Sequence, residues 1–77
     1  MNITSCDKTN GDYRILKYEF NLQSDTEKKY QASIWYSTED GKFIDWIILY
    51  QDGSTVPSDE EDEILVYLDE NWYSLTR

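Results

Sequence analysis

The chain has 77 residues, which suffices for one small domain, residues 1–77, and leaves no room for a second core. Its 16 acidic and 7 basic residues give a formal charge of −9, which disfavours direct binding to nucleic-acid phosphates or an anionic membrane and favours a cationic partner. The longest apolar run, residues 46–50, is far shorter than the roughly 20 residues of a membrane span. The first residues lack a secretory pattern and Cys6 is the only cysteine, so we expect a cytoplasmic protein.

Three segments have the pattern of β-strands. Apolar and polar residues alternate from Tyr13 to Leu22 and again over residues 30–36, and residues 42–51 are rich in β-branched and aromatic side chains. Residues 1–11 add a fourth, edge strand if Ile3–Cys6 pairs with the first of these segments across a turn at residues 8–11. We therefore predict an antiparallel meander of three strands, or of four with the N-terminal segment.

The turn at Asp40-Gly41 decides the register of the last two strands. A three-residue loop with the glycine at a bulge produces one continuous apolar face, whereas a two-residue loop sets Tyr36 against Asp45. We favour the three-residue loop, because the buried pattern determines register. The predicted pairs are Tyr36 with Ile44, Ile34 with Trp46, Ala32 with Ile48, and Tyr30 with Tyr50.

The segment after Pro57 predicts a helix from Ser58 to about Ser74. Ser58 and Glu61 have the spacing of a capping box, and an acidic first turn complements the helix dipole. One side of the helical wheel is apolar and would cover the even-numbered face of the sheet. This side consists of Ile64, Leu65, Leu68, Trp72 and Leu75. The predicted fold class is α+β, with one C-terminal helix packed on one face of an antiparallel sheet.

The chain offers little for catalysis or metal binding. It has no histidine, and its one cysteine and three glycines form no nucleophilic, zinc-binding or phosphate-cradling motif. The carboxylates at residues 59–63 point around a helix instead of converging, which argues against a metal ion. Asp45 and Asp52 are weak candidates for an acid–base pair. We therefore predict a protein that is not an enzyme and that uses no cofactor or metal.

The predicted helix carries most of the unbalanced charge. Acidic and basic residues are equal in number over residues 1–38, so the whole formal charge of −9 belongs to residues 39–77. Seven carboxylates over residues 59–70 give roughly one charge per 2.4 Å of helix axis, compared with one per about 1.7 Å in duplex DNA. Such a face either serves solubility alone or docks on a basic groove meant for phosphate. Apolar and aromatic residues among the acids support docking. The predicted binding residues are Asp59, Glu60, Asp62, Glu63, Val66, Tyr67, Asp69, Glu70 and Tyr73.

The odd-numbered face of the predicted sheet is a second candidate surface. Its residues are Ile15, Trp35, Phe43, Ile47 and Leu49. Such a face is too apolar to remain in water, so we expect the N-terminal segment with Met1 and Ile3 to fold over it. The alternative is a homodimer formed through Trp35, Phe43, Ile47 and Leu49.

In its small size, negative pole and lack of catalytic residues, the chain resembles the small acidic inhibitors that bacteriophages make against CRISPR and restriction nucleases. It is also similar to the immunity proteins that neutralise nuclease toxins. The resemblance concerns general character and covers no defined motif. It implies a phage-encoded, DNA-mimicking inhibitor that occupies a basic, nucleic-acid-binding surface of a larger protein in a bacterial host cell. An immunity protein and a small homodimeric adaptor are the alternatives.

Overall fold

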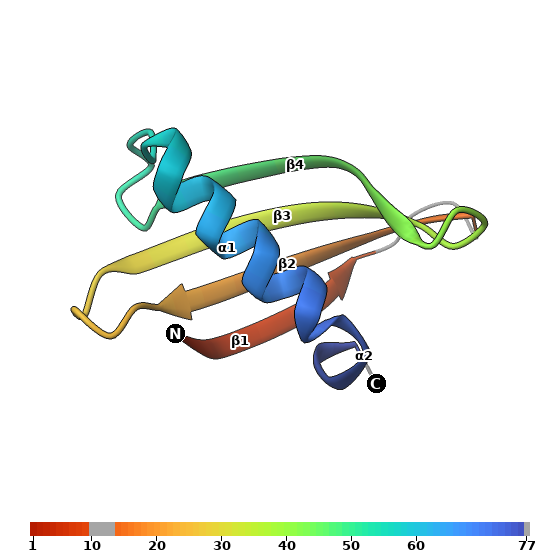
Figure 1. Ribbon diagram of the computed structural model, residues 1–77, viewed down its shortest axis with the longest axis horizontal. Helices are drawn as coiled ribbons and strands as arrows, with labels where there is room; N and C mark the ends of the chain where they lie inside the picture. Colours follow the sequence, from red (N-terminus) through yellow and green to blue (C-terminus); the bar gives the residue numbers. More distant parts are fainter. Residues whose placement is uncertain (10–13, 77) are drawn as a thin grey trace.

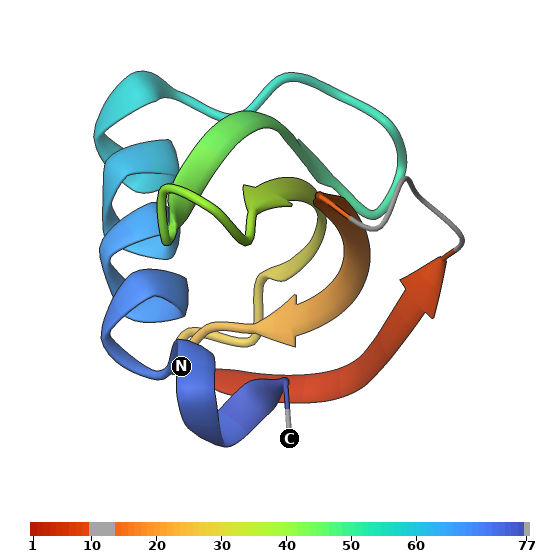
Figure 2. The ribbon, with the colours of Figure 1, turned by 90° about the vertical axis from the view of Figure 1, so that its right-hand side faces the viewer.

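The computed structural model describes residues 1–9 and 14–76 and has the predicted α+β fold. Its antiparallel strands form one sheet in the order β1-β2-β3-β4, and a helix crosses one face of the sheet diagonally (Figure 1). The view in Figure 2 places this helix, α1, on one side of the sheet. In chain order the elements are β1 (Asn2–Thr9), β2 (Ile15–Gln23), β3 (Lys29–Ser37), β4 (Lys42–Tyr50), α1 (Ser58–Glu70) and α2 (Trp72–Leu75).

The N-terminal segment forms the fourth strand, and the predicted pairing of Ile3–Cys6 with β2 is confirmed. The predicted turn at residues 8–11 is wrong for Lys8 and Thr9, which continue β1, and residues 10 and 11 lie outside the described residues, as does the predicted strand start at Tyr13. Met1 and Ile3 pack against the core on the helix side. The segment therefore does not cover the odd-numbered face, because its backbone gains more hydrogen bonds by pairing with β2.

The register of β3 and β4 follows the prediction along most of its length. The pairs Tyr30 with Tyr50, Ala32 with Ile48, and Ile34 with Trp46 are confirmed. The predicted pair of Tyr36 with Ile44 is wrong, because a turn over residues 38–41 and a register shift after Trp35 place Tyr36 opposite Phe43.

Helix packing gives the physical reason for this shift. The ring centroid of Trp72 lies 5.0 Å from that of Tyr36 and 4.8 Å from that of Phe43. The shift thus moves Phe43 from the odd-numbered face to the helix side, where it joins an aromatic cluster. Ile44 is 44% exposed instead of buried.

The core lies between the sheet and the predicted apolar side of the helix. Ile64, Leu68 and Trp72 are buried, and Leu65 and Leu75 are half-buried and pack against the same cluster. The sheet contributes Tyr18, Phe20, Leu22, Tyr30, Ala32, Ile34 and Ile48 to this core. The apolar side of the helix is therefore confirmed.

The two ends of the predicted helix differ from expectation. Pro57 is the N-cap residue and Ser58 makes no capping hydrogen bond, so the predicted capping box is wrong. The Glu61 amide donates to the Pro57 carbonyl at 3.0 Å, and the Glu61 carboxylate accepts instead from the indole nitrogen of Trp46 at 2.8 Å. The helix also breaks at Asn71, whose side chain donates to the Tyr67 carbonyl at 2.8 Å, and then resumes as α2.

Candidate partner-binding surface

Five carboxylates lie on the side of α1 that faces away from the sheet. They are Asp59, Asp62, Glu63, Asp69 and Glu70. All five are exposed, and the ion pairs found in the described part of the chain involve other residues. This side of α1 is therefore a continuous negative surface, which we call the acidic face.

The charge spacing on the acidic face can be compared with that of DNA. Five charges spread over eleven helical steps, about 16 Å, give roughly one charge per 3.3 Å of axis. A single strand of duplex DNA carries one phosphate per about 3.4 Å. The acidic face thus approaches the linear charge density of one DNA strand, about half the density of the duplex.

The remaining two carboxylates of α1 turn toward the sheet. Glu60 accepts hydrogen bonds from the ammonium of Lys28 at 2.7 Å and from the hydroxyls of Tyr30 and Tyr50. The bond from Lys28, followed by that from Tyr50, lowers the pKa of Glu60. Glu60, a predicted binding residue, therefore ties α1 to the sheet and does not belong to the acidic face. Glu61 is likewise held by Trp46.

Val66 lies in the middle of the acidic face and is 55% exposed. Its neighbours three and four positions away on the helix are all carboxylates, namely Asp62, Glu63, Asp69 and Glu70. Val66 and Tyr67, with Asp62, Glu63 and Glu70, line an open hollow of about 400 Å³. We call this the acidic hollow, and it combines apolar and carboxylate groups in one depression.

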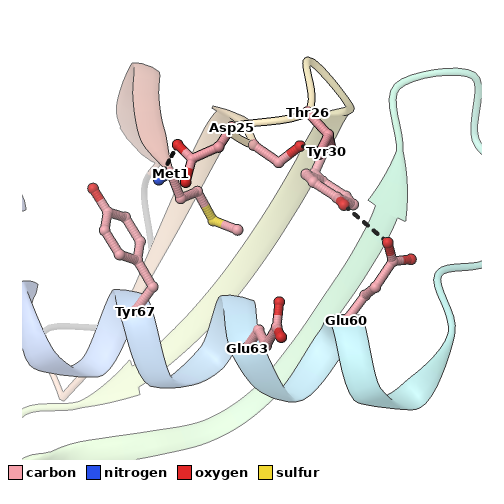
Figure 3. A pocket seen from close by; sticks show the side chains of 8 residues that line it. Met1, Asp25, Thr26, Tyr30, Glu60, Glu63 and Tyr67 are labelled. Carbon is pink, nitrogen blue, oxygen red and sulfur yellow. Dashed lines mark hydrogen bonds and ion pairs between the residues drawn. The ribbon is translucent and has the colours of Figure 1, made fainter.

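A second depression, of about 360 Å³, lies between α1, the N-terminus and the β2–β3 turn. Figure 3 shows Glu60, Glu63 and Tyr67 projecting from α1 on one side of it, with Asp25 and Thr26 opposite. Its N-terminal ammonium and the Asp25 carboxylate form an ion pair at 3.1 Å. Glu63 and Tyr67 line both depressions, so the two are neighbours along α1.

The nine predicted binding residues thus fall into three groups. Seven are exposed, and among them Tyr73 of α2 is 80% exposed. These seven are Asp59, Asp62, Glu63, Val66, Asp69, Glu70 and Tyr73. Tyr67 is half-buried at the edge of the acidic hollow, and Glu60 points inward. Trp46 is 39% exposed and lies beside Glu61, although strand alternation assigns it to the core.

The odd-numbered face is less apolar than the alternation suggests. Phe43 lies on the helix side of the sheet, against Trp72. The cross-strand neighbours of Ile47 and Leu49 are the polar residues Ser33 and Gln31. The Lys17 ammonium lies 5.0 Å from the centre of the Trp35 ring and covers part of it. The four residues proposed for a homodimer therefore do not share one face.

Side chains considered for chemistry are engaged in local contacts. The described residues contain no group of three or more cysteine and carboxylate side chains placed to hold a metal ion. Asp52 accepts hydrogen bonds from the hydroxyl and amide of Ser54, which lower its pKa, and Asp45 accepts from the Trp46 amide. Cys6 is exposed, and partial burial of its thiol, together with Asp7, raises its pKa.

Comparison of the chain with protein-family models, with curated proteins and with solved structures finds no match. Within the described ranges no helix is long and apolar enough to cross a membrane.

Proposed function

We propose that the protein is a small acidic inhibitor whose acidic face occupies the basic, nucleic-acid-binding surface of a larger protein. The observation that carries this proposal is the set of five exposed carboxylates around the exposed side chain of Val66, whose average charge density along the helix axis is close to that of one DNA strand. A face that serves only solubility has no need of the exposed side chain of Val66 at its centre. The class of target is a nuclease or related enzyme of a bacterial host, and the source is a phage.

Binding would proceed by electrostatic attraction followed by local loss of water. The formal charge of −9 steers the protein toward a cationic groove, and this steering weakens as salt increases. Val66 and Tyr73 then lose contact with water at the interface. Glu60 and Glu61 hold the first turns of α1 against the sheet, so the backbone that carries the acidic face needs no rearrangement before binding. A backbone that is already in place loses little conformational entropy on binding.

A charge-reversal experiment tests this mechanism. The double variant Glu63→Lys/Glu70→Lys should abolish inhibition of the target nuclease and leave the melting temperature nearly unchanged, because both side chains are exposed. The matched control is Asp7→Lys/Glu27→Lys, which reverses two exposed charges outside α1 and raises the formal charge from −9 by the same amount. An equal loss of inhibition in the two double variants would show that net charge, and not the acidic face, is responsible. Full inhibition by Glu63→Lys/Glu70→Lys would show that the acidic face is not the contact.

The target can be isolated by capture from a bacterial lysate on the immobilised protein. We expect a nucleic-acid-binding enzyme that elutes with increasing salt and that duplex DNA displaces from the acidic face. The wild-type protein should in turn compete with DNA for the purified enzyme. A captured protein whose binding is insensitive to both salt and DNA would contradict the proposal.

An immunity protein against a nuclease toxin would use the same kind of surface, and the genes beside its coding sequence distinguish the two. A toxin gene next to it would identify the immunity protein. The homodimeric adaptor has less support, because Phe43 packs against Trp72 and is separated from Trp35, Ile47 and Leu49.

A further inference from the structure

The acidic hollow has a property that a simple phosphate mimic does not need. Val66 and Tyr67 supply apolar surface, and Asp62, Glu63 and Glu70 supply the carboxylates around it. Val66 stands one helical turn from Asp62 on one side and from Glu70 on the other. A ligand that fits must therefore combine an apolar stem with a cationic end.

We propose that the acidic hollow seats one arginine side chain of the partner protein, an inference that rests on the proposed function. The methylene stem of arginine packs on Val66, and its guanidinium reaches a neighbouring carboxylate with a two-pronged hydrogen bond. Tyr67 also lines the hollow, and guanidinium groups stack on aromatic rings. Each of the three features of the hollow thus has a counterpart in arginine.

Other ligand classes fit the hollow less well. Its carboxylates repel nucleic acid and phosphorylated ligands. A lysine ammonium is a compact, strongly hydrated charge that neither forms the two-pronged bond nor stacks on Tyr67 as a planar group. A wholly apolar side chain would contact Val66 but would remove water from Glu63 and Glu70 without replacing its hydrogen bonds.

The proposal can be tested on the full chain without knowledge of the partner. The probes are the capped peptides acetyl-Gly-Arg-Gly-amide, its lysine version, and its citrulline version, which keeps the shape of arginine but lacks the charge. Each is titrated at low salt into isotope-labelled protein while the backbone amide NMR signals are followed. We expect the arginine peptide to shift the amide signals of residues 62–70. It should bind about two- to fivefold more tightly than the lysine peptide, and the citrulline peptide should not bind.

Two matched variants separate the hollow from general electrostatic attraction. Val66→Ser should weaken arginine binding about three- to fivefold by removing apolar contact. Ile47→Ser is the control, because Ile47 is 51% exposed on the opposite face of the sheet, close to the 55% of Val66. It should leave the affinity unchanged. Both positions are exposed, so we expect each serine variant to fold like the wild type, and circular dichroism checks this.

Three results would overturn the proposal. They are equal affinity for the arginine and lysine peptides, shifts spread equally over the acidic β3–β4 turn, and full affinity in the Val66→Ser variant. Any of these, together with intact salt-dependent inhibition, would leave the proposed function standing as pure charge mimicry. Arginine binding without any inhibition would instead remove the proposed function and preserve the arginine site.

Discussion

Replacing Trp72 with alanine should cost more stability than any other single truncation in α2. Trp72 is only 5% exposed, and its ring centroid lies 5.1 Å from Tyr18, 5.8 Å from Phe20, 5.0 Å from Tyr36 and 4.8 Å from Phe43. Truncation of a buried tryptophan to alanine costs about 3–5 kcal/mol. A domain of this size has a total stability of about 4–12 kcal/mol. The variant should therefore lose at least about a quarter of its free energy of unfolding.

The assay is urea unfolding followed by far-ultraviolet circular dichroism, because the other two tryptophans complicate a fluorescence signal. The melting temperature should fall by roughly 12–40 °C, since about 4–8 °C corresponds to each kcal/mol in small domains. The control is Tyr73→Ala at the next position, which is 80% exposed and should change stability by less than about 0.5 kcal/mol. A loss below about 1 kcal/mol for Trp72→Ala, or equal losses in both variants, would refute the packing of α2 against the sheet.

Three further predictions follow from local chemistry. Hydrogen bonds, first from Lys28, lower the pKa of Glu60, so its contribution to stability is present above the ordinary carboxyl pKa of about 4.3 and disappears as the pH falls through the lower folded value. Glu60→Gln should therefore flatten the dependence of melting temperature on pH between about pH 5 and pH 3, and an unaltered dependence would disprove the network. Gly41 has a φ of 65°, so Gly41→Ala should lower the free energy of unfolding in urea by about 1–2 kcal/mol and Gly41→Asn by less, because asparagine tolerates a positive φ better. Equal losses in the two variants would contradict backbone strain at this position. The raised pKa of the Cys6 thiol should make the native protein react with a thiol reagent at pH 8 more slowly than the urea-unfolded chain, and equal rates would contradict that pKa shift.

The sequence predicted the elements of the fold whose pattern is set by local geometry. Alternation identified the described parts of β2, β3 and β4, and the apolar stripe identified the buried side of the helix. The register shift beside Trp35 could not be predicted in the same way. It depends on contacts of Tyr36 and Phe43 with Trp72, which lies about thirty residues further along the chain. Tertiary packing overrode the local preference of the turn.

The candidate site shows the same division. The helical wheel correctly directed Asp62, Glu63 and Glu70 away from the sheet. It could not assign Glu60, which stands at the border of the apolar side and takes its direction from Lys28. That partner precedes β3 and is 32 residues away, so no local pattern links the two. The loss of the predicted capping box has a similar origin, because the Glu61 carboxylate is held by Trp46.

The two edge strands of the sheet affect the tendency of the protein to aggregate. Thr55 forms a bridge with Leu49 along β4, and the Tyr50 amide donates to the Ser54 carbonyl at 3.0 Å, so part of that border is occupied by the chain itself. At the opposite border, β1 carries the charged residues Asp7 and Lys8 and a register irregularity near its start. Both devices hinder the edge-to-edge stacking that leads to fibres. An inhibitor of the proposed kind would have to accumulate until it matched its target in number, and protected sheet edges would favour a high concentration without aggregation.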